Sequence, residues 1–160
     1  MKIILSEEEL DKAKWVSAGR NAQNEGGKDK PYYHRELMQS DDVAGVASAA
    51  AECAVAKAVN RHWHAKVWPR DEHWRHVDEP DVGENIEVRR IRESGNGLVV
   101  RKKDLHKGKV IFVAYPDPLT GFKEVEVIGW LKADDAWEIG EDYLEDTKRV
   151  PQRLLRREGL

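Results

Sequence analysis

The sequence predicts a mixed α/β or α+β domain in which helices flank a central mixed β-sheet. Two helix-forming segments come first, from Ser6 to about Asn21 and from Val43 to about Trp63. From Asp81 onward the hydrophobic period changes to two, which is typical of strands. Because a further helical segment follows the strands, we expect helices to pack on the sheet. The 160 residues suit one domain over 1–160, with an N-terminal helical segment at about 6–38.

The helices have recognisable start signals. Ser6 precedes three glutamates, as expected for an N-cap with an acidic first turn. Gly26-Gly27 marks a loop after this first helix. Ser40 offers a second cap before the alanine-rich helix, whose composition strongly favours helix. The last helix is expected from Ala133 to about Leu144.

The strands are indicated by alternating or continuous apolar residues. We expect them at 86–89, 98–100, 110–114 and 122–131, with turns between them. The apolar run at 110–114 predicts a buried central strand. Residues 62–79 have no clear period and are interpreted as irregular or partly strand. Three tryptophans are expected in the core: Trp15, Trp130 and Trp137.

Composition excludes several classes of protein. The single cysteine, Cys53, cannot form an intrachain disulfide, and no secretory signal is recognised at the start. The longest uncharged stretch, Val43 to Ala51, falls short of the ~20 apolar residues that cross a bilayer. We therefore expect no membrane insertion and a location in the cytoplasm.

The charge is unevenly distributed. From Arg89 to Lys109 there are eight basic and two acidic residues, a local balance of +6 in a chain whose net charge is −3. Such a basic stretch suits a polyanion, so nucleic acid is the expected partner. The candidate contacts are Arg90, Arg92, Arg101, Lys102 and Lys103, with Arg153, Arg156 and Arg157 as further candidates. The acidic residues between 132 and 145 are interpreted as solvated surface.

Three acidic residues carry the candidate chemistry. At helical spacing, Glu52 lies on the small and apolar face that should pack on the sheet, where an unpaired carboxylate is costly. Asp81 precedes a bend at Gly83 that can bring its carboxylate beside Glu87. Two adjacent carboxylates repel each other unless a cation lies between them, and oxygen ligands suit Mg²⁺ or Mn²⁺.

These residues resemble a known family. Pro80-Asp81, Glu87-x-Arg89 and the upstream helical Glu52 resemble the motif of the PD-(D/E)XK nuclease superfamily, most of all its small phage and prophage members. The resemblance covers about Val43 to Leu131. It implies a restriction-endonuclease-like core and metal-dependent hydrolysis of DNA. The implied catalytic residues are Glu52, Asp81, Glu87 and Arg89, and the implied metal ligands are Asp81, Glu87, Glu52 and the Val88 carbonyl.

The departure from the family pattern is Arg89, where the superfamily usually has lysine. A guanidinium stays protonated and is a poor general base. In the superfamily this lysine also occurs on other elements, and Lys57, Lys102 and Lys103 are candidates for it here. The resemblance also suggests that Arg20, on the first helix, reaches the site.

Other interpretations remain open from the sequence. The alternative function is a catalytically inactive protein on the same fold that binds nucleic acid or a host protein as a regulator. The sequence is compatible with a homo-oligomer or a protein partner, and nothing in it requires either. His62, His64, His73 and His76 form a cluster that suggests zinc, although scattered histidines are the preferred interpretation. Three tryptophans are candidates either for stacking nucleobases or for the core: Trp63, Trp68 and Trp74.

Overall fold

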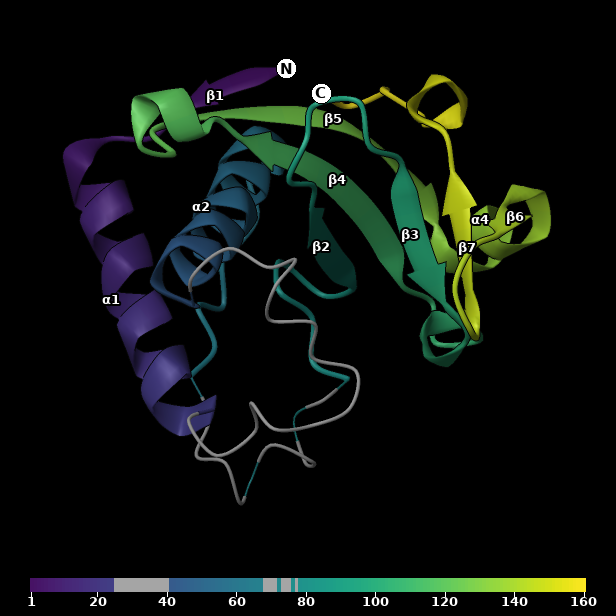
Figure 1. Cartoon of the computed structure of the whole chain (residues 1–160), viewed down its shortest axis with the longest axis horizontal. Coiled ribbons are helices and arrows are strands. Elements are labelled where there is room, and N and C mark those ends of the chain that lie inside the picture. The colour runs from purple at the N-terminus through teal and green to yellow at the C-terminus, as the bar shows by residue number, and fades with distance from the viewer. Residues whose placement is uncertain (25–40, 68–71, 73–75, 77) are drawn as a thin grey trace.

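The computed structural model describes residues 1–24, 41–67, 72, 76 and 78–160 (Figure 1). Its architecture is mixed α+β, as the sequence predicts. Several sequence predictions lie outside the described residues: the loop at Gly26-Gly27, the cap at Ser40, and the roles of Trp68, His73 and Trp74. None of the described helices has an apolar stretch long enough to cross a bilayer.

Along the described chain, a short strand and two helices come first, four of the strands follow, and a short helix and two strands come last. The helices are α1 (Glu7–Asn24), α2 (Asp41–Val59) and α4 (Ala133–Ile139). The strands are β1 (Lys2–Ile4), β2 (Ile86–Arg90), β3 (Leu98–Arg101), β4 (Val110–Pro116), β5 (Glu124–Lys132), β6 (Glu141–Asp142) and β7 (Thr147–Val150). In the part of the chain that the structure describes, the short 3-10 turns are η4 (Lys102–Asp104), η5 (Pro118–Thr120) and η6 (Gln152–Leu154). The predicted strands are thus confirmed, while β1, β6 and β7 were not predicted.

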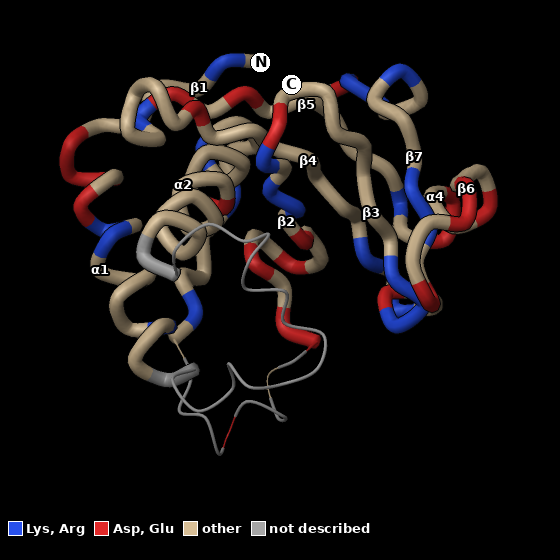
Figure 2. Tube along the Cα trace, in the orientation of Figure 1, with Lys and Arg blue, Asp and Glu red and all other residues tan. Residues whose placement is uncertain are grey.

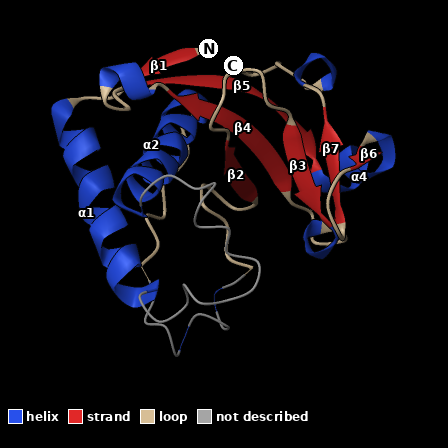
Figure 3. Ribbon diagram, in the orientation of Figure 1, coloured by secondary structure: helices blue, strands red, loops and turns tan. Residues whose placement is uncertain are grey.

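The strands form two sheets (Figure 3). The larger sheet has the order β1-β5-β4-β2, in which β2 is parallel to β4 and the other neighbours are antiparallel. The smaller, antiparallel sheet has the order β3-β7-β6. This topology makes β4 a central strand, as its apolar sequence predicts, and leaves β2 at an edge of the larger sheet.

Each face of the larger sheet borders its own hydrophobic core. Helix α2 covers one face and α1 packs against α2; Ile86, Val88 and Phe112 contribute to this core from the sheet. The smaller sheet and α4 cover the other face, where Ile91, Ile111 and other residues are buried. Successive strand residues point to opposite faces of the sheet. Whether a residue of β2 or β4 has an odd or an even number therefore decides whether its side chain meets the helices or the smaller sheet.

The helix ends follow from local chemistry. Ser6 and Glu9 form a capping box, with Glu9 N donating to Ser6 Oγ at 3.1 Å and Ser6 N donating to Glu9 Oε1 at 2.8 Å. Helix α2 ends at Val59, earlier than predicted, because Asn60 adopts a left-handed conformation (φ 53°). The N–H of Arg61 then bonds the Ala56 carbonyl, as in a Schellman motif.

Two sequence predictions need correction. The last helix does not reach Leu144: it ends at Ile139, because Glu141 and Asp142 pair with the oppositely charged Arg149 and Lys148 of β7. Figure 2 shows the acidic residues of α4 and β6 beside basic residues of β7. Trp15 is not in the core, since 73% of it is exposed on α1. The prediction was based on the apolar side chain of Trp15 alone, which does not show which side of α1 it lies on.

Candidate functional site

Helices α1 and α2 approach closely enough for their side chains to form a buried ion pair. A Cβ added to Gly45 would lie 2.2 Å from Ser17 Oγ, so the helices meet where side chains are small. One turn beyond Ser17, Arg20 donates to Glu52 from its two terminal guanidinium nitrogens, Nη1–Oε2 at 2.6 Å and Nη2–Oε1 at 3.0 Å. Glu52 is only 5% exposed, so the prediction that it lies on the packing face of its helix is confirmed.

Asp81 lies at the outer edge of β2. Its Oδ2 accepts the N–H of Val88 at 2.9 Å, and its Oδ1 lies 3.2 Å from Lys66 Nζ. Because the N–H and C=O of one strand residue point to the same side, the Val88 carbonyl faces this edge too. The backbone of Lys66 is connected to α1, because its carbonyl accepts a hydrogen bond from Arg20 Nε at 2.8 Å.

These contacts define a four-charge cluster made of Arg20, Glu52, Lys66 and Asp81. Burial raises the pKa of Glu52, and the negative charge of Asp81 adds to that, while the bond from Arg20 opposes it. The outcome is a Glu52 pKa above its ordinary value. Burying ionised groups is unfavourable, and replacing such a network by apolar side chains is often neutral or stabilising. Four mostly buried charges at one sheet edge therefore indicate a functional site more than a structural one.

The raised pKa of Glu52 predicts a specific pH dependence. A carboxyl that binds its proton more tightly in the folded state contributes stability at low pH, and this is lost as pH rises from the unfolded value of about 4.5 to the folded value. We expect Glu52→Gln to remove this fall in the free energy of unfolding. Urea denaturation between pH 4 and 8 measures the free energy of unfolding at each pH. The readout is the slope of this free energy against pH, because the variant also leaves Arg20 without its partner and so changes the absolute stability. Identical slopes in both proteins would contradict the assignment.

Glu87 and Arg89 belong to a different network. By strand parity they share a face with Ile91, and that face meets the smaller sheet rather than α2. Glu87 Oε1 lies 3.2 Å from Lys109 Nζ, and its Oε2 lies 3.5 Å from Arg89 Nη1. The structure therefore brings Glu52 and Asp81 together, while Glu87 is held on the opposite side of β2.

Arg89 is fixed by a buried carboxylate that the sequence did not single out. Its Nη2 lies 3.0 and 2.9 Å from the two oxygens of Asp104, which is 1% exposed. The N–H of Arg101 also bonds Asp104, at 2.9 Å. With its guanidinium engaged by Asp104, Arg89 acts in this arrangement as a cross-link between β2 and η4.

A three-carboxylate metal site is not assembled in this arrangement. Among residues 1–24, 41–67, 72, 76 and 78–160, no group of three or more His, Cys, Asp or Glu side chains is placed to hold a metal ion. Glu52, Asp81 and the Val88 carbonyl fit a hard divalent cation in donor chemistry, because carboxylate and carbonyl oxygens are the ligands that such ions prefer. Glu87 faces away from these donors. The metal set of Asp81, Glu87, Glu52 and Val88 therefore stays a prediction, with two of its acids side by side.

The predicted nucleic-acid contacts are spread over several elements. Arg101, Lys102 and Lys103 are exposed at the end of β3 and in η4, and Arg92 is exposed just after β2. Arg90 is half-buried, on the α2 side of β2 by parity. Other members of the basic stretch are engaged with acids, since Lys107 and Lys109 both approach Asp78, at 2.7 and 3.8 Å. The +6 stretch is thus partly neutralised within the fold.

The remaining candidates meet other partners. Lys57 bonds the Ile4 carbonyl and Glu9, and so is engaged away from the four-charge cluster. His64 Nε2 lies 2.6 Å from the Gly83 carbonyl, while His76 pairs with Glu79. His62 contacts His64 ring to edge, but the histidines in the described part of the chain do not converge on one point that could hold zinc.

The most important residue missed by sequence reasoning is Lys66. It lies in the segment without periodicity, so nothing in its neighbours indicated a direction for its side chain. It approaches Asp81 because the chain returns from α2 along the edge of β2, where His64 N bonds the Asp81 carbonyl at 3.1 Å. Asp104 and Lys109 were not singled out either, because they lie in the basic stretch from Arg89 to Lys109, which was interpreted as a contact surface for nucleic acid.

Comparison with protein-family models, curated proteins and solved structures gave no match to this chain.

Proposed function

We propose that this chain is a metal-dependent nuclease on a restriction-endonuclease-like core, with its site at the four-charge cluster rather than at the full predicted set. The observation that carries the proposal is the pair of carboxylates, Glu52 and Asp81, placed within mutual electrostatic influence at the edge of β2. Two such carboxylates repel each other, and a divalent cation would relieve the repulsion. Bound Mg²⁺ or Mn²⁺ would supply an activated water and neutralise charge on a scissile phosphate.

The other members of the cluster have distinct tasks in this proposal. Arg20 holds both oxygens of Glu52 and so fixes the direction of that carboxylate. Lys66 contacts Asp81, and in this proposal it takes the role for which Lys57, Lys102 and Lys103 were the candidates from the sequence. Its ammonium can steady negative charge on a phosphate, and Arg89 is not needed for that task.

Cleavage of plasmid and linear DNA in Mg²⁺ or Mn²⁺ tests this proposal. We expect cleavage that EDTA abolishes. Glu87→Gln should retain most of the wild-type rate, because its side chain contacts Lys109 and Arg89 on the other face. Absence of cleavage with either metal would contradict the nuclease proposal. A loss in Glu87→Gln as large as in cluster variants would show that all three acids act together.

A second candidate is a non-catalytic nucleic-acid-binding protein on the same fold. It is favoured by a specific observation: each oxygen of Glu52, Asp81 and Glu87 already has a cationic or N–H partner. Networks satisfied in this way can be purely structural. This candidate predicts DNA binding without hydrolysis, and binding that survives Glu87→Gln; metal-dependent cleavage by the purified wild type would refute it.

A further inference from the structure

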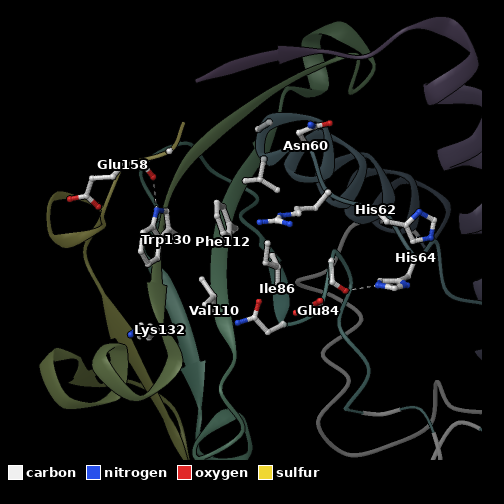
Figure 4. A pocket seen from close by; sticks show the side chains of 16 residues that line it. Asn60, His62, His64, Glu84, Ile86, Val110, Phe112, Trp130, Lys132 and Glu158 are labelled. Carbon is white, nitrogen blue, oxygen red and sulfur yellow. Dashed lines mark hydrogen bonds between the residues drawn. The ribbon is translucent and has the colours of Figure 1, made fainter.

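A cavity of about 820 Å³ opens beyond the C-terminal end of α2 (Figure 4). It is bounded by the segment after α2, the turn at Gly83–Asn85, strands β2, β4 and β5, and the C-terminal residues Glu158 and Gly159. Its volume lies in the range of about 300–1,000 Å³ that is usual for small-ligand sites. The cavity exists because α2 ends at Val59 and leaves part of the sheet face uncovered.

The floor of the cavity is an aromatic pair on two neighbouring strands. Phe112 of β4 and Trp130 of β5 are directly opposite in the ladder, with ring centroids 6.2 Å apart and planes inclined by 23°. Ile86 and Val110 extend the same surface toward β2. Figure 4 shows Trp130, Phe112 and Ile86 one after another across the sheet, with Val110 below Phe112 on the same strand.

The Trp130 ring is held in a fixed position. Its Nε1 donates to the Glu158 carbonyl at 3.0 Å, and its backbone pairs with Arg156 on the returning C-terminal segment. In Figure 4 the Glu158 carboxylate points away from the aromatic pair. A ring that is already fixed loses little conformational freedom when a flat ligand stacks on it.

Three cations lie around the aromatic pair. Arg61 and Lys132 line the cavity, and the Arg156 guanidinium lies 5.6 Å from the Trp130 ring centroid. Within the described ranges, none of these three side chains has an ion-pair partner. Glu84 is the acidic side chain at the opposite rim and is exposed. Arg61 and Lys132 therefore bring positive charge to the cavity that no acidic side chain of the described residues neutralises, while Arg156 is already in contact with the Trp130 ring.

From this arrangement we infer that the cavity binds a nucleobase together with its adjoining phosphate, delivered by a single-stranded nucleic acid. Aromatic side chains on a sheet stack exposed bases, and neighbouring cations hold the backbone. A paired base has both faces covered by its neighbours and cannot lie on the aromatic pair. Asp81 belongs to the four-charge cluster and Gly83, two residues later, lines the cavity. The inference rests on the proposed function only where it connects the bound strand with that cluster.

Fluorescence anisotropy of a labelled 12-nucleotide oligo(dT), measured in EDTA to separate binding from hydrolysis, tests the inference. We expect the single strand to bind more tightly than a duplex of the same length, and free dTMP to compete weakly. Arg61→Gln with Lys132→Gln should weaken binding roughly 10-fold, since two phosphate contacts are removed. Trp130→Leu should weaken it by a similar factor, whereas Trp130→Phe, which keeps a ring, should bind more tightly than Trp130→Leu.

The matched control is Lys14→Gln with Lys123→Gln, which removes two exposed positive charges from other surfaces. Equal loss in the control and the cavity double variant would overturn the inference, as would equal affinity for dTMP and the oligonucleotide. Should Trp130→Leu fail to fold by circular dichroism, the cavity double variant still decides. Cavity-dependent binding in EDTA, together with absence of cleavage when Mg²⁺ or Mn²⁺ is supplied, sustains this inference and refutes the nuclease proposal. Cleavage by wild type, with unchanged binding in the cavity variants, does the reverse.

Discussion

Asp81→Asn is expected to lower the rate of metal-dependent DNA cleavage at least about 100-fold while leaving the fold intact. Changes in residues that merely support a metal ligand already cost roughly 10–100-fold, and a ligand should cost more. The amide retains an oxygen that can accept the Val88 N–H, so the local structure should persist. It removes the negative charge that faces Glu52 and with it the reason for a divalent cation at this edge. Initial cleavage rates at saturating Mn²⁺ measure the effect.

The matched control for Asp81→Asn is Asp78→Asn, a substitution of the same type on the other network. Asp78 is exposed and contacts Lys107 and Lys109, so its loss should leave cleavage nearly unchanged. Thermal denaturation of both variants establishes that each is folded. If Asp81→Asn cleaved DNA at the same rate as the wild type, the four-charge cluster would have no part in the mechanism, whatever the rate of the control.

Asp104→Ala is expected to lower the free energy of unfolding by about 3–5 kcal/mol, the usual effect of removing one partner of a buried ion pair. The substitution takes both carboxylate oxygens from Arg89 and the acceptor from Arg101 N–H, at a residue that is 1% exposed. Urea denaturation at pH 7 measures the change. Asp104→Asn keeps an acceptor oxygen and should lose less, and a loss below about 1 kcal/mol in Asp104→Ala would contradict this role.

The acid sensitivity of the same pair has a definite sign. Burial by itself raises the pKa of Asp104, but the positive charge of Arg89 and the N–H of Arg101 outweigh it and hold the pKa below the ordinary 3.8. A lowered carboxyl pKa contributes stability that is present above the unfolded value and is lost as pH falls through the folded value. Wild type should therefore lose stability more steeply below about pH 4 than Asp104→Ala does. Parallel acid curves would argue against the pairing.

Local signals in the sequence were sufficient for most elements. The Ser6 cap, the alanine-rich helix and the alternation from Ile86 onward each depend on neighbours within a few residues, so they can be recognised without the fold. The same locality explains the errors. The sequence around Glu141 is compatible with continued helix, and its pairing with β7 is a contact between segments that the helical pattern cannot include.

The candidate site divides along the same line. Sequence alone determined that Glu52 lies on the apolar face of its helix and that Glu87 and Arg89 share one face of a strand. Its expectation that the Asp81 carboxylate lies beside Glu87 does not hold in the structure. Only the tertiary structure decided that Ile86 and Val88 face α2, because apolar side chains gain most from burial against that helix. With Ile86 and Val88 on the α2 side, Glu87 and Arg89 point to the other face, where they contact Lys109 and Asp104. The cluster of Asp81, Glu52, Arg20 and Lys66 lies at the edge of β2.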